Sequence, residues 1–169
     1  IRRKDIVYNY RYAGGDVTIY KMTGKQLKDY MEWAADYFDT IQPGDTEYRY
    51  NSERAGRKYV TFDIFGGVKY KIDLRNEKGN KITDLMLVNG KEITSGMELK
   101  VGMNAYRFEQ LARKGGIFDG QEIPVLWASK EAIGEIDGTI QNMMIDYIKN
   151  VKNGIIEGKS HNNWKIIGL

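Results

Sequence analysis

Apolar residues in this chain recur with two different periods, and this mixture limits the possible folds more than any other feature. Over residues 68–74 every second residue is apolar, as in a strand with one buried face. Over residues 27–38 the apolar residues are three or four positions apart, as on one face of a helix, and Thr23 is a suitable residue to cap its start. Strand-like and helix-like segments interspersed with hairpins predict an α+β fold, not a doubly wound parallel sheet.

The remaining elements are assigned from the same patterns. Asn89-Gly90 predicts a hairpin with a type I′ turn, because these residues accept positive φ angles. The glycine-rich stretch at residues 104–120 is predicted to be a long loop. With no internal repeat and no linker, the 169 residues are expected to form one domain. Further strands are expected at residues 16–22, 82–88, 97–103, 123–127 and 164–167, and a second amphipathic helix at residues 140–151.

Composition excludes several function classes. The chain has no Cys and a single His, His161, so disulfides, Cys-zinc sites, thiol catalysis and multi-His metal sites are unavailable. The net charge of +3 is too small for the broad basic surface of a protein that binds nucleic-acid polymers. No segment approaches the ~20 apolar residues of a membrane span. We therefore expect no membrane span, and no self-sufficient metal-dependent hydrolase in this chain.

A run of tyrosines near the N-terminus is the first candidate binding segment. Residues 8–15 (YNYRYAGG) place aromatic side chains beside a Gly-Gly turn, where they could stack on a planar ligand. Stacking of an aromatic ring on a base contributes about 1–3 kcal/mol and depends little on which base it is. The same tyrosines could instead alternate along a strand, with one face in the core. The sequence leaves both interpretations open.

Two more candidate segments lie in the glycine-rich second half of the chain. At the end of a predicted strand, Asn104 could hydrogen-bond a base edge and Tyr106 could supply a second stacking face. Gly115 and Gly116 would let the backbone approach a ligand closely, and Asp119 could accept a hydrogen bond from a ribose hydroxyl or an exocyclic amine. The alternatives are an ordinary strand end and a plain turn, since neither a P-loop nor a GxGxxG motif is present.

Several motifs, in order along the chain, together resemble one known family. They are IRRKDIVYNYRY, TIYKMTGKQLKDYMEWAADYF, YVTFDIFGGVKYKIDL, LMLVNGKEI, MNAYRF followed by KGGIF, and the terminal HNNWKI. With these motifs the chain resembles the C-terminal domain of bacterial 5′-nucleotidases, most closely the branch of 2′,3′-cyclic-nucleotide 2′-phosphodiesterase/3′-nucleotidases. The resemblance extends over almost all of residues 1–169.

The resemblance implies a fold and a context. The fold would be a single α+β domain over residues 1–169, with mixed and antiparallel sheets layered with helices. The parent protein would also carry an N-terminal metallophosphoesterase domain with a pair of divalent metal ions and the catalytic residues. No cofactor, metal ligand or catalytic residue is therefore expected in this chain, and the isolated chain is expected to be inactive. The location would be outside the cytoplasm: periplasm, cell wall or secreted.

The resemblance also implies a role in substrate recognition. The base of a nucleoside or nucleotide would be stacked between the rings of Tyr12 and Tyr106. The other expected binding residues are Asn104, Arg107, Gly115, Gly116 and Asp119. This chain departs from the usual family pattern at Ala13-Gly14, at Ala105 and in the added length of residues 108–114.

Three alternatives from other classes remain. The chain could be a non-catalytic glycan-binding or adhesion module of the cell surface, because aromatic rings also stack on sugars. Two parallel rings would favour a nucleotide, whereas a single exposed ring would favour a sugar. It could bind single-stranded RNA, although the small net charge disfavours this. It could also be a recognition domain that has lost its ligand, as the departures at Ala13-Gly14 and Ala105 would suggest.

Overall fold

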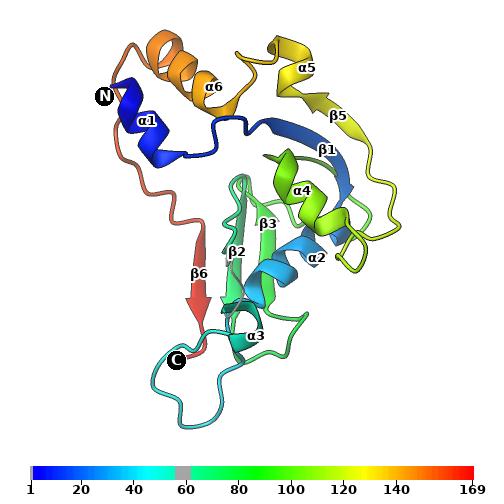
Figure 1. Cartoon of the computed structure of the whole chain (residues 1–169). Coiled ribbons are helices and arrows are strands. Elements are labelled where there is room, and N and C mark those ends of the chain that lie inside the picture. Colours follow the sequence, from blue (N-terminus) through cyan, green and yellow to red (C-terminus); the bar gives the residue numbers. More distant parts are fainter. Residues whose placement is uncertain (1, 56–61) are drawn as a thin grey trace. The chain divides into compact units, whose positions relative to one another are not determined.

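The computed structural model describes residues 2–55 and 62–169, and the chain forms two compact units (Figure 1). Unit 1 comprises Ile1–Met22 and Leu99–Ser160, and unit 2 comprises Thr23–Glu98 and His161–Leu169. Each unit has a three-stranded sheet with helices, which confirms the predicted α+β class. The assignment of residues 1–169 to one nucleotidase C-terminal domain stays a prediction.

Unit 1 is built around the sheet β4-β1-β5, in which β1 and β5 are antiparallel and Thr18 lies opposite Ala128. Along the chain, β1 ends and β4 begins at the sequence boundaries with unit 2, whereas β5 lies within unit 1. In chain order its elements are α1 (Arg3–Asn9), β1 (Val17–Thr23), β4 (Glu98–Asn104), α4 (Ala105–Ala112), β5 (Val125–Ala128), α5 (Ser129–Ile133), α6 (Ile140–Asp146) and the π-helical turn η1 (Tyr147–Val151).

Aromatic rings fill the interior of unit 1. The ring of Phe108 on α4 stacks on the ring of Tyr20 on β1, with centroids 3.9 Å apart and planes inclined by 18°. Phe118 lies next to Phe108, with centroids 6.2 Å apart, and is fully buried together with Leu111. Burial of these rings removes a large apolar area from water and fixes α4 against the sheet.

Unit 2 contains the mixed sheet β3-β2-β6, in which β2 pairs antiparallel with β3 and parallel with β6. Val68, Tyr70, Ile72 and Leu74 are all buried, which confirms the predicted alternation. Figure 1 shows α2 beside β3, and the apolar face of α2 packs there. The elements of unit 2 are α2 (Gly24–Ala35), α3 (Ser52–Ala55), β2 (Val68–Asp73), β3 (Ile82–Leu87) and β6 (Trp164–Ile167).

A buried polar network joins α2 to β3. The Glu32 carboxylate accepts hydrogen bonds from the backbone N–H groups of Lys81 (2.8 Å) and Ile82 (2.9 Å). The Lys81 ammonium donates to the carbonyl oxygen of Phe38 at 2.5 Å. Burial lowers the pKa of Lys81, and the nearby carboxylates of Asp36, Asp39 and Glu32 oppose that effect. Buried polar groups of this kind stabilise only when each has a partner, as these have.

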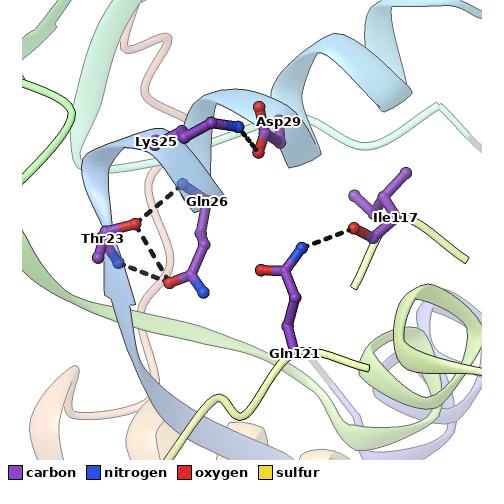
Figure 2. A network of polar contacts seen from close by, with 6 residues as sticks. All are labelled: Thr23, Lys25, Gln26, Asp29, Ile117 and Gln121. Atoms are coloured by element: carbon purple, nitrogen blue, oxygen red, sulfur yellow. Dashed lines mark hydrogen bonds and ion pairs between the residues drawn. The ribbon is translucent and has the colours of Figure 1, made fainter. Parts of the chain in front are cut away.

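The start of α2 follows the sequence prediction. Thr23 Oγ1 accepts the N–H of Gln26 (3.2 Å), and Gln26 Oε1 accepts the N–H of Thr23 (2.9 Å), as Figure 2 shows. These reciprocal bonds form a capping box, which satisfies backbone donors that the first helical turn leaves unpaired. Lys25, in the same first turn, pairs with Asp29 one turn later at 2.6 Å.

Two local predictions are wrong. Residues 105–112 form the helix α4 and not a loop, because Asn104 caps its start and Phe108 and Leu111 give it an inward face. In the hairpin after β3, Gly90 has a φ of 87° but Asn89 has no positive φ, so the turn is not type I′. Of the two interpretations left open for the tyrosine run at residues 8–15, the strand does not form, since α1 ends at Asn9 and β1 begins only at Val17.

The hydrogen bonds of this hairpin explain the difference. The N–H of Gly90 donates to the carbonyl of Leu87 (2.9 Å), and the N–H of Leu87 donates to the carbonyl of Lys91 (2.8 Å). A turn followed by one left-handed glycine closes the hairpin, which needs a positive φ only at Gly90. The returning arm is short: its bridge to β3 is the pair Met86 and Glu92.

No described helix is both long enough and apolar enough to cross a lipid bilayer.

The second predicted amphipathic helix is present as α6, and its last part continues as the π-helical turn η1.

Candidate functional site

The first predicted stacking residue, Tyr12, lies in the segment between α1 and β1. The chain turns directly after it, with the N–H of Gly15 donating to the carbonyl of Tyr12 at 3.0 Å. The side chain is 71% exposed, one of the highest values among the large apolar and aromatic residues described. Tyr12 is therefore an aromatic surface held at a turn, as its position beside Gly14-Gly15 predicted.

Tyr10 supports Tyr12 from one side. The two rings meet edge to face, with centroids 5.6 Å apart and planes inclined by 65°, an arrangement that favours aromatic pairs. A Cβ atom added to Gly15 would lie 2.2 Å from the Tyr10 hydroxyl oxygen, so only glycine leaves room for this ring. Burial raises the pKa of Tyr10, while the hydrogen bond from Asn104 opposes that effect, so the phenol stays protonated at neutral pH.

The backbone of Tyr10 is also held at both ends. Its N–H donates to the carbonyl of Ile6 (2.9 Å), which closes the last turn of α1. Its carbonyl accepts a hydrogen bond from the side chain of Gln141 on α6 (2.7 Å). Tyr10 is thus fixed by α1, which precedes it in the chain, and by α6, which lies far from it in sequence.

Asn104 stands at the junction of β4 and α4. Its Oδ1 accepts the N–H of Tyr106 at 2.8 Å, which caps the start of α4. Its Nδ2 donates to the Tyr10 hydroxyl, a contact between residues 94 positions apart in the chain. One side-chain amide therefore connects the two segments that carry the predicted stacking residues.

Tyr106 lies in the first turn of α4, with its side chain 61% exposed. Phe108, two positions later, packs into the interior of unit 1. Successive helical residues are about 100° apart around the axis, so Tyr106 faces away from that interior. Arg107 is half-buried on the same helix.

The glycine loop follows the other end of α4. Gly115 has a φ of 78°, and its N–H donates to the Asp119 carboxylate at 2.8 Å. A Cβ atom on Gly116 would lie 2.2 Å from the carbonyl oxygen of Leu111, so the loop packs closely against the helix end. The N–H of Phe118 also donates to Leu111, at 2.9 Å. In this loop Gly115, Gly116 and Asp119 have evident structural roles.

A further bond closes the same loop on its far side. The side chain of Gln121 donates to the carbonyl of Ile117 at 3.0 Å, as Figure 2 shows. The loop is thus held by its own hydrogen bonds and by the buried ring of Phe118.

The structure joins some of the predicted residues and separates others. Contacts run from Tyr12 through Tyr10 and Asn104 to Tyr106, a set that we call the tyrosine cluster. This cluster meets α4 at its N-terminal end, whereas the glycine loop meets its C-terminal end. An eight-residue helix is about 12 Å long, so the two predicted groups attach to α4 roughly that far apart along its axis.

Tyr10 is the residue of the cluster that sequence analysis did not single out. It belongs to the tyrosine run, but nothing in the run distinguishes a supporting ring from an exposed one. Gly15, five positions further on, was the available signal, because a glycine near an aromatic run can mark a close approach of a ring to the backbone.

A separate cavity in unit 1 contains none of the predicted residues. It has a volume of about 570 Å³, and its lining includes Arg2, Arg3 and Lys149 together with Ile6, Ile145 and Ile148. Within residues 2–55 and 62–169, no group of three or more acidic or histidine side chains is arranged to hold a metal ion.

Known proteins resemble the chain in sequence. It is 32% identical over 161 residues to the trifunctional nucleotide phosphoesterase protein YfkN of Bacillus subtilis, a match that covers 89% of this chain and 10% of that protein. It is 25% identical over 168 residues to a 2′,3′-cyclic-nucleotide 2′-phosphodiesterase/3′-nucleotidase of Haemophilus influenzae, covering 90% of this chain and 24% of that protein. The chain thus spans between a tenth and a quarter of the length of these relatives.

Experimental structures share the fold. A Staphylococcus aureus protein described as a 5′-nucleotidase superposes with a TM-score of 0.74 at 21% identity, over 96% of this chain and 29% of that one. A 5′-nucleotidase precursor of Thermus thermophilus superposes with a TM-score of 0.59 at 13% identity, over 99% of this chain and 28% of that one. The family model for the C-terminal domain of 5′-nucleotidases matches residues 1–113. This chain therefore belongs to the 5′-nucleotidase C-terminal domain family.

Proposed function

We propose that this chain recognises the nucleoside part of the substrate in a metal-dependent nucleotide phosphohydrolase, of the 2′,3′-cyclic-nucleotide 2′-phosphodiesterase/3′-nucleotidase or 5′-nucleotidase kind. Family membership and the names of the relatives support the general class. The observation that carries the proposal is that Tyr12 and Tyr106 are both strongly exposed and belong to one connected cluster.

The physical argument concerns apolar surface. Large aromatic side chains are usually buried, because exposing their faces to water costs free energy. Two exposed tyrosines in one connected cluster gain stability when a flat, weakly polar group covers them. A nucleobase has this shape, and stacking contributes about 1–3 kcal/mol per base whichever base is present.

The other predicted residues would contribute polar contacts. Asp119 uses Oδ2 to accept the N–H of Gly115, and Oδ1 of the same carboxylate would suit a ribose hydroxyl. Arg107 follows Tyr106 and would supply positive charge near the phosphate. These roles, like the stacking itself, are part of the proposal.

The hydrolytic chemistry would belong to a metallophosphoesterase domain elsewhere in the parent protein. A metal pair there would activate the attacking water and stabilise the transferred phosphoryl group. We propose no catalytic residue and no metal ligand within this chain, and an extracytoplasmic location for the parent protein. With divalent metal added, the purified chain is expected not to hydrolyse 3′-AMP, and phosphate release above the background rate would contradict this.

Calorimetric titration of the chain with adenosine and 3′-AMP tests the recognition role. Tyr12→Ala and Tyr106→Ala should each weaken binding by roughly fivefold to 150-fold, the equivalent of about 1–3 kcal/mol. Tyr147→Ala is the matched control, because Tyr147 is 50% exposed and lies in the same unit outside the tyrosine cluster. Its affinity should equal that of the unsubstituted chain.

Two outcomes would contradict the proposal. Equal weakening by all three substitutions would indicate nonspecific stacking on exposed tyrosines. A folded chain that binds neither ligand would show that it does not recognise nucleosides by itself, and titration with sugars would then test the glycan-binding alternative.

A further inference from the structure

We infer that Tyr10 is a positioning residue, which acts through the Asn104 side chain to hold Tyr12 and Tyr106 in a single arrangement. This inference rests on the proposed function, because it concerns how the same two rings are prepared for a ligand. It assigns to Tyr10 and Asn104 a task inside the protein instead of a direct contact with the base.

The first step is that Tyr10 itself is fixed. Its N–H is bonded to Ile6, its carbonyl to Gln141, and its ring lies against the backbone of Gly15. Three independent constraints from different parts of unit 1 therefore determine where the hydroxyl lies. A hydroxyl held in this way is a fixed reference point for whatever bonds to it.

The second step is that Asn104 is oriented from both ends. Its Oδ1 can only accept, and it faces the N–H of Tyr106; its Nδ2 can only donate, and it faces the Tyr10 hydroxyl oxygen. Rotating the amide by 180° would place NH₂ against the N–H of Tyr106, two donors face to face. One orientation therefore satisfies both partners, and these two bonds fix which end of the amide faces each of them.

The third step concerns the two rings. The Tyr12 ring rests against the Tyr10 ring, and the first turn of α4, which carries Tyr106, rests on the Asn104 cap. Removing the Tyr10 hydroxyl would leave both stacking rings in place but remove the direct hydrogen bond between the segments that bear them. Ligand binding would then have to restore their arrangement, which lowers affinity because ordering costs free energy.

Two substitutions isolate this connection. Tyr10→Phe keeps the ring beside Tyr12 and Gly15 but removes the acceptor oxygen. Asn104→Ser keeps a good helix cap for Tyr106 but is too short to reach Tyr10. Each should weaken 3′-AMP binding by about threefold to thirtyfold, and the double variant should be no weaker than the weaker single variant, because both remove the same link.

The control is Tyr30→Phe, which removes the 2.8 Å hydrogen bond from the Tyr30 hydroxyl to Asp63 in unit 2. It makes the same chemical change and should leave 3′-AMP affinity unaltered. Affinities are compared at a temperature where every variant is folded. A purely structural role of Tyr10 would lower the unfolding temperature without changing the affinity of the folded chain.

A second measurement needs no ligand. The N–H of Tyr106 is held by Asn104, so its hydrogen exchange, followed by NMR, reports on the cap. Tyr10→Phe should accelerate this exchange, whereas Tyr30→Phe should not.

The outcomes separate this inference from the proposed function. If Tyr12→Ala and Tyr106→Ala weaken binding but Tyr10→Phe does not, Tyr10 is not a positioning residue and the proposed function stands. If no substitution in the cluster alters binding, the proposed function fails. Hydrogen exchange at the Tyr106 N–H in Tyr10→Phe then tests the connection between Tyr10 and Asn104 separately. An unchanged exchange rate overturns that connection, and a faster rate supports it.

Discussion

Two core tyrosines of unit 2, Tyr30 and Tyr70, differ from the two stacking candidates of unit 1 in burial and in what surrounds them. Tyr30 and Tyr70 in unit 2 are 5% and 4% exposed, whereas Tyr12 and Tyr106 in unit 1 are 71% and 61% exposed. The Tyr30 hydroxyl donates to Asp63, and the Tyr70 ring stacks on Trp164 with centroids 6.3 Å apart. The same residue type thus serves as core at Tyr30 and Tyr70 and as surface at Tyr12 and Tyr106.

This difference shows what makes an aromatic residue a candidate for ligand binding. A buried ring has already gained the stability that burial offers, so a ligand can add nothing to it. An exposed ring has that gain available, provided its own position is fixed. In unit 1 the proposed positioning residues are Tyr10 and Asn104, and Tyr12 and Tyr106 remain 71% and 61% exposed.

The largest expected effect is on the free energy of unfolding, and it tests the contrast between buried and exposed tyrosines. Tyr30→Ala should lower the free energy of unfolding by about 3–5 kcal/mol, because it removes a buried ring and leaves a cavity. Tyr12→Ala should change it by no more than about 0.5 kcal/mol, since the ring is mostly in water. Urea unfolding followed by circular dichroism measures both, and a loss of several kcal/mol in Tyr12→Ala would place that residue with the structural tyrosines.

An intermediate loss of stability is expected from substitutions in the glycine loop, where Gly115 and Gly116 have structural roles. Gly116→Ala should destabilise the chain by about 2–3 kcal/mol, because the new Cβ atom would meet the backbone of Leu111 and Arg113. Gly115→Ala should cost about 1 kcal/mol, since space is open there and only the positive φ is unfavourable. The paired measurement is thermal unfolding, and equal costs would mean that the close packing at Gly116 is relieved easily.

The smallest expected effect is on the pH of acid unfolding, and it comes from an ion pair at the end of β2. Arg75 donates to Asp73 through Nε (2.8 Å) and Nη2 (2.6 Å), and these bonds lower the pKa of the Asp73 carboxyl below 3.8. A lowered folded-state pKa adds stability above the unfolded value, and this stability is lost as the pH falls through the folded value. Arg75→Lys, which cannot form the two-pronged contact, should shift acid unfolding to slightly higher pH.

The control for this prediction is Lys69→Ala, an exposed cation on the same strand. Its acid unfolding curve should coincide with that of the unsubstituted chain. Acid unfolding that is unchanged in Arg75→Lys would mean that this pair, in which Arg75 is exposed and Asp73 is buried, contributes nothing measurable.

Much of the fold could be predicted from short-range patterns. Alternation over residues 68–74 identified a strand whose apolar residues are all buried, and Thr23 with Gln26 forms the expected helix start. Residues 105–112 were wrongly predicted as part of a loop, because the glycines that follow them (115, 116 and 120) and the charged residues outweighed the cap at Asn104 in that prediction. A short helix is decided by packing of its few apolar side chains, here Phe108 and Leu111, and not by propensity.

The sequence by itself determined the local features and the family, because a cap, an alternating strand or a motif depends only on residues a few positions apart. It also drew attention to Tyr12 and Tyr106 as two separate aromatic segments. Only the tertiary structure decided that Tyr10 and Asn104 meet across 94 positions and that Glu32 accepts the backbone N–H groups of Lys81 and Ile82. Contacts of this kind follow from how the elements pack, since a side chain's partners and exposure are set by neighbours that its own segment does not encode.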